Sequence, residues 1–383
     1  MTTIQSIRLF HLSAKLDNPI GNAVVTFDRR DTLLVHVTAS DGTTDWGESW
    51  ASPTEVAGVI GARLAPVLLG QNALRPGRLW QRMQAACGWD RLGTTMMAVA
   101  ALDIALHDLA ARLQGVPVSD LLGGVLRDRV PAYASGPFFR PGGHPFRTYA
   151  VEAEAYLREG YRAVKLRIGF APHDDAKVVQ DVRRALGEET GLMVDFNQSV
   201  TPRAALQTAG MMQAANLIWI EEPALPADLE GYRLLSGHMA PALAGGETFG
   251  AASQFRPFLE SNCLDVLQPD IALCGGLSGV ARVAMLAELF ARPLLPHVWG
   301  STVNFHAALH LTACLPAVRG GGFSPFPWME VDMGPNPLLD LCGRPAPGAD
   351  GMLGVPQGPG LGCDLTAEAI APYVVWSRVI EME

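Results

Sequence analysis

The sequence predicts an α/β protein whose larger part is a parallel barrel, and three observations support this. Apolar strand-like segments alternate with helical segments from about residue 129 to residue 315. Only 17% of the 383 residues are charged, against the usual quarter or so, so much of the chain must lie in an interior. No phosphate-binding glycine motif follows the first of these strands. Strands this apolar are typical of a parallel sheet that helices cover on both faces.

The first 127 residues predict a separate α+β unit. Strand-like runs rich in Ile, Val, Leu and Thr cover residues 4–12, 32–37 and 44–49, and a loop containing Pro19 is expected over residues 15–30. Helical patterns follow over residues 53–68, 79–86 and 94–113. A small sheet followed by helices is an α+β arrangement.

Residues 128–345 predict the barrel, with strand-like runs separated by helical ones. The runs are VPAYASG, AVKLRIG, GLMVDFNQ, LIWIEEP, PALAGGET, DVLQPDIAL and RPLLPHVWG. Seven or eight such units favour a (β/α) barrel over an open doubly wound sheet, which usually has fewer strands and a G-x-G-x-x-G loop. Residues 346–383 begin rich in Gly and Pro, and we expect them to form a tail that returns over the body.

The composition excludes several classes of protein. A net charge of −9 argues against nucleic acid or an anionic membrane as the main partner. The sequence has no stretch of 18 uncharged apolar residues, and its start does not have the pattern of a signal peptide. The six cysteines show no C-x-x-C spacing, so a reduced, cytoplasmic protein with scattered core thiols is expected.

Charged residues follow successive predicted strands of the barrel. They are Lys165 with Arg167, then Asp195, Glu221, Glu247, Asp270 and His297. Successive positions from 165 to 297 differ by 30, 26, 26, 23 and 27 residues, or about one strand, one helix and two loops. A single acidic residue at a strand end is more often a helix cap, but this repetition indicates that all of them face one barrel mouth, where active sites lie.

Asp195, Glu221 and Glu247 follow three consecutive strands and can share one metal ion. Three carboxylates so close would repel each other strongly unless something neutralised them. Ligands that are all oxygen select a hard divalent cation, of which Mg²⁺ is the common one. The sequence therefore predicts a magnesium site.

The flanking residues indicate the chemistry. Lys165 and Arg167 are expected on one side of the metal, and Asp270 with His297 on the other. A carboxylate substrate on Mg²⁺ would have its developing negative charge stabilised during abstraction of its α-proton. Asp270 can hold His297 in the tautomer that leaves one ring nitrogen free for that proton.

Taken together, these residues resemble the enolase superfamily, in the mandelate racemase-like branch of its mandelate racemase/muconate lactonizing enzyme family. The matching segments are AVKLRIG, VDFNQ, WIEEP, GGE, QPD, PHVWG, the tail PGLGCDL and, before the barrel, ALDIALHDLAARLQGVPVSDLLGG. The ordered set is specific and spans nearly the whole chain.

The resemblance implies a (β/α)₇β barrel under an α+β cap that the C-terminal tail completes. It implies Mg²⁺ bound by the three carboxylates, the His297–Asp270 dyad, and a late-barrel carboxylate, Glu330, that hydrogen-bonds the substrate carboxylate. It also implies a specificity loop at about residues 15–30, and a homo-oligomer, often an octamer.

One departure from the branch bears on the reaction. The branch usually carries Lys-x-Lys at the second barrel strand, with the second Lys as acid/base, whereas this chain has Lys165-Leu166-Arg167. Arginine does not accept a proton at neutral pH, so Arg167 is interpreted as a fixed cation and His297 as the acid/base. A single acid/base residue suits syn dehydration of a sugar acid, an aldonate or aldarate, to a 2-keto-3-deoxy acid.

Two alternatives remain open at this stage. One is a racemase or epimerase, with Arg167 or Lys165 as a second base, and the other is a non-catalytic barrel that retains its metal. Dehydration requires polar groups for the sugar hydroxyls. The candidates for these contacts are Asn22, Thr26, Asp28, Arg29, Arg30, Tyr133, Ser135 and Asn197.

Overall fold

A curled parallel sheet forms the larger part of the molecule in the computed structural model, which describes residues 2–319 and 324–381. Its strand order is β10-β4-β5-β6-β7-β8-β9. The strands are β4 (Arg129–Ser135), β5 (Ala163–Arg167), β6 (Gly191–Asp195), β7 (Trp219–Glu221), β8 (Ala242–Gly245), β9 (Val266–Leu267) and β10 (Met329–Asp332). Parallel bridges from Leu267 to Leu294 and from Asp270 to His297 add residues 294–297 beside β9. The predicted α/β barrel is confirmed.

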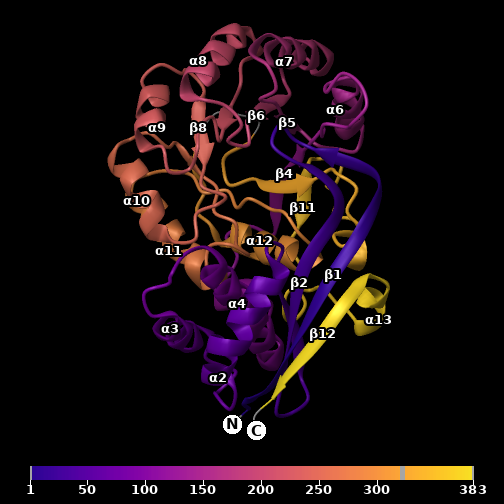
Figure 1. Cartoon of the computed structure of the whole chain (residues 1–383), viewed down its shortest axis with the longest axis vertical. Helices are drawn as coiled ribbons and strands as arrows, with labels where there is room; N and C mark the ends of the chain where they lie inside the picture. The colour runs from indigo at the N-terminus through magenta and orange to yellow at the C-terminus, as the bar shows by residue number, and fades with distance from the viewer. Residues whose placement is uncertain (1, 320–323, 382–383) are drawn as a thin grey trace.

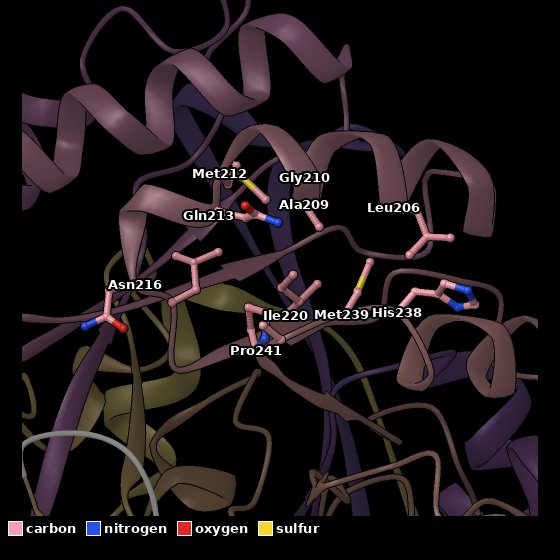
Figure 2. A pocket seen from close by; sticks show the side chains of 12 residues that line it. Leu206, Ala209, Gly210, Met212, Gln213, Asn216, Ile220, His238, Met239 and Pro241 are labelled. Carbon is pink, nitrogen blue, oxygen red and sulfur yellow. The ribbon is translucent and has the colours of Figure 1, made fainter.

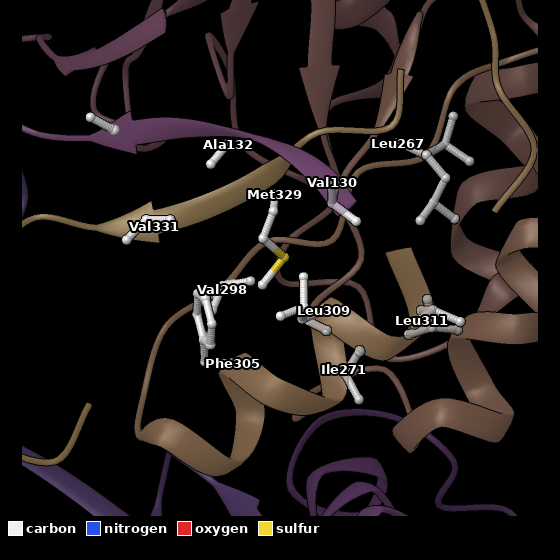
Figure 3. Packing of buried hydrophobic residues seen from close by; sticks show 14 of the residues in the cluster. Val130, Ala132, Leu267, Ile271, Val298, Phe305, Leu309, Leu311, Met329 and Val331 are labelled. Atoms are coloured by element: carbon white, nitrogen blue, oxygen red, sulfur yellow. The ribbon is translucent and has the colours of Figure 1, made fainter. Parts of the chain in front are cut away.

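Helices surround this sheet, as Figure 1 shows. They are α6 (Tyr149–Arg158), α7 (Pro172–Leu186), α8 (Pro202–Met211), η2 (Gln213–Ala215), α9 (Leu229–Ser236), α10 (Ala252–Glu260), α11 (Gly276–Leu289) and α12 (Thr302–Cys314). Figure 3 shows the packing between the sheet and α12, where Val331 and Met329 of β10 lie over Phe305 and Leu309. A second cluster, which includes Trp219 and Trp328, fills the barrel interior, so the barrel is a packed core with its open end at one mouth.

The cap contains a four-stranded antiparallel sheet in the order β12-β1-β2-β3. Its strands are β1 (Ile4–Gly21), β2 (Thr26–Ala39), β3 (Thr44–Ser49) and β12 (Val374–Glu381). Its helices are α1 (Pro53–Val59), η1 (Ile60–Leu64), α2 (Ala65–Leu68), α3 (Pro76–Cys87), α4 (Gly93–Gln114) and α5 (Val118–Leu121). Helix α4 packs closely on β3, where a Cβ on Gly47 would lie 1.9 Å from the Ala101 carbonyl oxygen.

The predicted loop over residues 15–30 is wrong, because this segment is the far end of a long β-hairpin. Lys15 pairs with Arg29 and Gly21 with Thr26, and within this segment the register shifts between Lys15 and Ile20. Pro19 lies in this irregular stretch. Figure 1 shows the hairpin running from the cap to the barrel near β5. There Gly21 exchanges two backbone hydrogen bonds with Phe139, of 2.8 and 2.9 Å, so the hairpin is attached to the barrel mouth.

The C-terminal tail returns to the cap, as the sequence predicts. Strand β11 (Met352–Gly354) pairs with the start of β4, and β12 pairs with β1. The short helices of this part of the chain are η3 (Asp340–Cys342), before β11, and α13 (Ala367–Ile370) and η4 (Ala371–Tyr373), after it. Strands β1 and β12, from the two ends of the described chain, therefore lie side by side (Figure 1). The domain limits at residues 127 and 345 stay predictions.

A disulfide corrects the expectation of scattered thiols. Cys342 and Cys363 are bonded, with their Cα atoms 6.0 Å apart, and the bond joins the segment after β10 to the tail. The spacing of 21 residues is not a motif, so the sequence alone did not indicate the pair. The other four cysteines are free thiols.

Two buried carboxylates of the cap bind the first turns of barrel helices. Asp103 in α4 accepts hydrogen bonds of 2.8 Å from both the backbone N–H and the hydroxyl of Ser278 in α11. Glu48 in β3 accepts from the backbone N–H groups of Ser301 and Asn304, at 2.6 and 2.8 Å, at the start of α12. The N–H groups of a first turn have no partner within the helix and favour a negative charge. These contacts fix the cap over the barrel.

Within residues 2–319 and 324–381, no helix is both long and apolar enough to span a membrane.

Candidate active site

A buried lysine and three carboxylates form the floor of the barrel mouth. The Lys165 Nζ lies 2.5 Å from Glu221 Oε1, 2.9 Å from Glu330 Oε1 and 4.0 Å from Asp195 Oδ2. Burial alone would lower the pKa of Lys165, but Glu221 and Glu330 raise it well above its ordinary value. These two carboxylates therefore favour the protonated, cationic form of Lys165.

The three predicted metal ligands come together. Asp195, Glu221 and Glu247 each offer an oxygen, and these oxygens lie within 4.8 Å of one another. Burial raises the pKa of Asp195 to about 6, although Lys165 opposes the rise, so the cluster resists full ionisation without another cation. Glu247 Oε2 is buried and accepts no hydrogen bond in the described part of the chain. An all-oxygen set with a free buried acceptor fits Mg²⁺.

Polar neighbours hold the ligand carboxylates in place. The backbone N–H and side-chain Nδ2 of Asn197 donate to the two oxygens of Asp195, at 2.7 and 2.8 Å. Trp219 Nε1 and Gln268 Nε2 donate to Glu221 Oε2, at 3.0 and 2.6 Å. Such partners orient metal ligands and are part of a metal site. Asn197 thus contacts a ligand carboxylate, and its predicted contact with substrate stays a prediction.

The predicted dyad is formed opposite Lys165. His297 Nδ1 lies 2.7 Å from Asp270 Oδ2, and its Nε2 lies 3.4 Å from Glu247 Oε2. An ionised carboxylate only accepts, so Nδ1 carries the hydrogen and Nε2 is the reactive nitrogen. Burial lowers the pKa of His297, but Glu247 and the bond with Asp270 raise it to about 10. A cation bound to Glu247 would offset its negative charge and so lower the pKa of His297.

Arg167 and Glu330 complete the mouth. Arg167 Nη2 donates to Ser135 Oγ at 3.2 Å, and its guanidinium lies 4.0 Å from the Phe138 ring centroid. Glu330 Oε2 accepts from the Val298 backbone N–H at 3.3 Å. Burial would raise the pKa of Glu330, but Lys165 and His297 lower it to about 2. Glu330 is therefore ionised and can only accept hydrogen bonds.

Of three further predicted substrate contacts, Asn22 and Arg29 lie apart from these charges, whereas the Tyr133 ring centroid is 5.8 Å from Lys165 Nζ. Asn22 Oδ1 accepts from the N–H groups of Val24 and Val25, both at 2.9 Å, and so closes the hairpin turn. The Arg29 side chain is 52% exposed and pairs only with Asp28 among the described residues. Tyr133 lies in the barrel interior against Trp219, with 5.5 Å between ring centroids. Their roles in substrate binding stay predictions.

One residue that we did not select from the sequence, Trp50, contacts the mouth, and so does Arg30, one of the candidates for substrate contact. Trp50, just after β3, donates from Nε1 to Asp270 Oδ2 at 2.9 Å. Arg30, which we ranked with Arg29, is buried, and its Nη2 lies 3.0 Å from Asp332 Oδ2. Successive side chains of a strand point to opposite faces, which places Arg30 inward and Arg29 outward. Because a loop was expected over these residues, the sequence did not reveal this alternation.

A cavity elsewhere on the barrel contains none of the predicted site residues. It has a volume of about 370 Å³ and lies between α8 and the connection from α9 to β8, as Figure 2 shows. Met212, Ile220 and Met239 are among its apolar lining, and His238 lies at one side. Because active sites of barrels lie at the C-terminal ends of the strands, we place the chemistry at the mouth.

The protein belongs to the mandelate racemase and muconate lactonizing enzyme family of the enolase superfamily. Residues 4–123 match the N-terminal domain of mandelate racemase and muconate lactonizing enzyme. Residues 148–369 match the enolase C-terminal domain-like family. The resemblance noted from the sequence is thereby confirmed.

Three similar proteins carry different activities. D-galactarolactone cycloisomerase of Agrobacterium fabrum is 34% identical over 97% of this chain and 98% of its own. D-gluconate dehydratase of Thermoproteus tenax is 30% identical over 89% of this chain and 69% of its own. A racemase from Streptomyces coelicolor, solved with bound magnesium, is 26% identical, with a TM-score of 0.85 over 97% of this chain and 100% of its own. The family thus supports a magnesium enzyme and leaves the reaction open.

Proposed function

We propose that the protein is a Mg²⁺-dependent dehydratase of a sugar acid, in which His297 is the only acid/base residue. The observation that carries this proposal is the asymmetry of the mouth. The barrel has the His297–Asp270 dyad near one end of its strand order. Its second strand has Arg167, which does not accept a proton at neutral pH, and Lys165, whose protonated form Glu221 and Glu330 favour. A reaction that needs one base therefore fits better than a reaction that needs one on each face.

Asp195, Glu221 and Glu247 would hold the Mg²⁺, which stabilises negative charge developing on the substrate carboxylate. Lys165 adds positive charge beside this carboxylate, and its buried position strengthens that stabilisation. Glu330 keeps Lys165 in place through their 2.9 Å ion pair. A hydrogen bond between Glu330 and the substrate carboxylate stays a prediction. It would require a proton between the two groups, and the ionised Glu330 has none to donate.

His297 then performs both proton transfers. Its Nε2 accepts the proton from the carbon next to the carboxylate once the charge of Glu247 is offset, and Asp270 stabilises the imidazolium that forms. The imidazolium returns this proton to the β-hydroxyl as its C–O bond breaks, so that water leaves. The remaining enol takes its keto form, and the product is a 2-keto-3-deoxy acid.

A screen of aldonates and aldarates with Mg²⁺ at neutral pH tests this function. Semicarbazide detects the keto product, and mass spectrometry shows the loss of one water. We expect the His297→Asn variant to lose the activity and the chelated enzyme to lose it reversibly. No product from any acid of a broad library would count against dehydration.

A second candidate is ring opening of a sugar lactone or anhydro sugar acid, which the similarity to D-galactarolactone cycloisomerase favours. A ring oxygen on the β-carbon can leave in the same way as a hydroxyl after the same proton abstraction. The product then has the mass of the substrate, whereas dehydration lowers the mass by one water. Mass spectrometry of products from lactones and open-chain acids distinguishes the two.

Racemisation is less well supported, because a second base would have to be Lys165 or Arg167. In deuterium oxide, a racemase would exchange the α-hydrogen of both stereoisomers, and we expect exchange from one only. A cytoplasmic location and a homo-oligomer stay predictions.

A further inference from the structure

Two buried guanidinium groups lie on neighbouring aromatic rings above the floor of the mouth. The Arg30 guanidinium carbon lies 3.8 Å from the Trp299 ring centroid, and that of Arg167 lies 4.0 Å from the Phe138 centroid. The two ring centroids are 6.0 Å apart. The charge of Arg167 acts on Arg30, since it helps burial to lower the pKa of Arg30. A residue of the cap hairpin and a residue of the second barrel strand thus bring their charges together.

Both guanidinium groups have unused hydrogen-bond donors. In the described part of the chain, the Nη1 atoms of Arg30 and Arg167 are buried and have no hydrogen-bond partner. Arg30 also donates from Nε to the Pro335 carbonyl oxygen at 3.1 Å and pairs with Asp332. Buried donors are normally satisfied, so two unsatisfied ones on neighbouring cations indicate a ligand that accepts from both.

The charges indicate the sign of that ligand. Lys165 is matched by Glu221 and Glu330, and Arg30 by Asp332. Arg167 has Ser135 as its polar partner, and its nearest acidic neighbour in the strand register is Asp195, with which it forms no ion pair among the described residues. A buried charge is costly unless it is paired, so the ligand should be an anion.

An anion between the two arginines would be a second one, in addition to the carboxylate that we propose at the metal cluster. Arg167 follows Lys165 by two residues on β5 and has the same side-chain direction, so it stands about 6–7 Å nearer to the mouth along the strand. Asp332, the partner of Arg30, follows Glu330 by two residues on β10 in the same way. Arg167 and the partner of Arg30 are thus one step nearer to the mouth than Lys165 and Glu330.

We infer that the substrate is a dicarboxylate, an aldarate or its lactone, whose second carboxylate binds between Arg30 and Arg167. This inference rests on the proposed function, which places the first carboxylate at the metal cluster. Guanidinium groups bind carboxylates through paired N–H donors, and both of these are held in place by an aromatic ring. An aldonate ends in a neutral hydroxymethyl group and leaves the buried charge of Arg167 unmatched.

Binding to the full-length His297→Asn protein with Mg²⁺ tests the inference without turnover. Calorimetry would compare hexarates with hexonates of the same configuration, namely glucarate with gluconate and galactarate with galactonate. Each pair differs only in the distal group. We expect at least one hexarate to bind about tenfold or more tightly than its hexonate, as for a charge-assisted hydrogen bond.

Substitutions to lysine assign the effect to the two arginines. Arg30→Lys retains the charge beside Asp332 and removes the free Nη1, and we expect it to weaken hexarate binding about tenfold without changing hexonate binding. Arg167→Lys should also lower the preference for the hexarate. Arg256→Lys is a matched control, because Arg256 is exposed and pairs with Glu260 on α10. Thermal unfolding shows whether each variant is folded.

The outcomes separate this inference from the proposed function. Equal or tighter binding of the hexonates, or a diacid preference that survives both substitutions, overturns the inference. Turnover of hexonates without a diacid preference overturns it and leaves dehydration intact. Tight, arginine-dependent binding of diacids without turnover supports the second carboxylate site and contradicts dehydration.

Discussion

Trp50 Nε1 donates a hydrogen bond of 2.9 Å to Asp270 Oδ2, the same oxygen that lies 2.7 Å from His297 Nδ1. Trp50 belongs to the cap and Asp270 to the barrel, 220 residues later. The carboxylate that orients the proposed base is therefore oriented in turn by the other domain. The Asp270 carboxylate has this additional donor only when the cap is seated on the barrel.

Replacing Trp50 by Phe removes this donor and retains an aromatic ring. We expect kcat to fall about tenfold with little change in KM, because the base is less well positioned, and the pH profile of kcat to shift. A loss of about 1 kcal/mol in the free energy of unfolding would accompany the lost bond. Trp89→Phe is the control, since Trp89 is 100% exposed. A Trp50→Phe enzyme with normal kcat and an unchanged pH profile would show that Trp50 is only a packing residue.

Glu48 attaches the cap beside the dyad and provides a second test of this coupling. Its carboxylate accepts from Ser301 and Asn304 at the start of α12, and Asn304 Nδ2 lies 3.3 Å from Asp270 Oδ1. In Glu48→Gln the amide NH₂ group would face backbone N–H donors that now bind a carboxylate oxygen. We expect this substitution to lower the free energy of unfolding by about 1–3 kcal/mol. Urea denaturation measures this loss, and Glu260→Gln, at an exposed ion pair, should change it little. Equal stabilities of the two variants would contradict the assigned contact.

Magnesium affinity should depend on pH because protons compete for the cluster. The pKa of Asp195 is raised to about 6 in the absence of metal, so below pH 6 this carboxyl group is mostly protonated and above it mostly ionised. Metal binding releases the proton, and we expect affinity to be about tenfold weaker at pH 5 than at pH 7. Calorimetry in buffers of different ionisation enthalpy measures both affinity and proton release. An affinity that is constant over this range would mean that Asp195 is ionised before the metal binds.

The barrel and the charged cluster could be predicted because both repeat along the sequence. Each unit of strand and helix places one residue at the same end of the sheet, so the spacing from Lys165 to His297 was sufficient to bring these residues together. Glu330 was identified from the family resemblance. Its distance from His297 along the sequence is longer than the regular spacing of the other residues, so the repeat did not predict it.

Contacts between the domains could not be predicted in this way. Trp50 and Glu48 act across more than 200 residues, and no local pattern links them to Asp270 or to α12. The hairpin over residues 15–30 was missed because Pro19 and its polar neighbours are typical of a loop. Since the register of that hairpin decides which arginine faces the mouth, the sequence could not distinguish Arg29 from Arg30, and the structure buries Arg30.

The central claim is that His297 is the acid/base of a Mg²⁺-dependent elimination from a sugar acid. The most direct measurement compares turnover of the best acid by the wild-type and His297→Asn enzymes, with Mg²⁺ binding measured on both. The account predicts that kcat falls by about 100- to 10,000-fold, as for the loss of a general acid/base, while Mg²⁺ still binds. A His297→Asn enzyme that turns over the acid at the wild-type rate would contradict it.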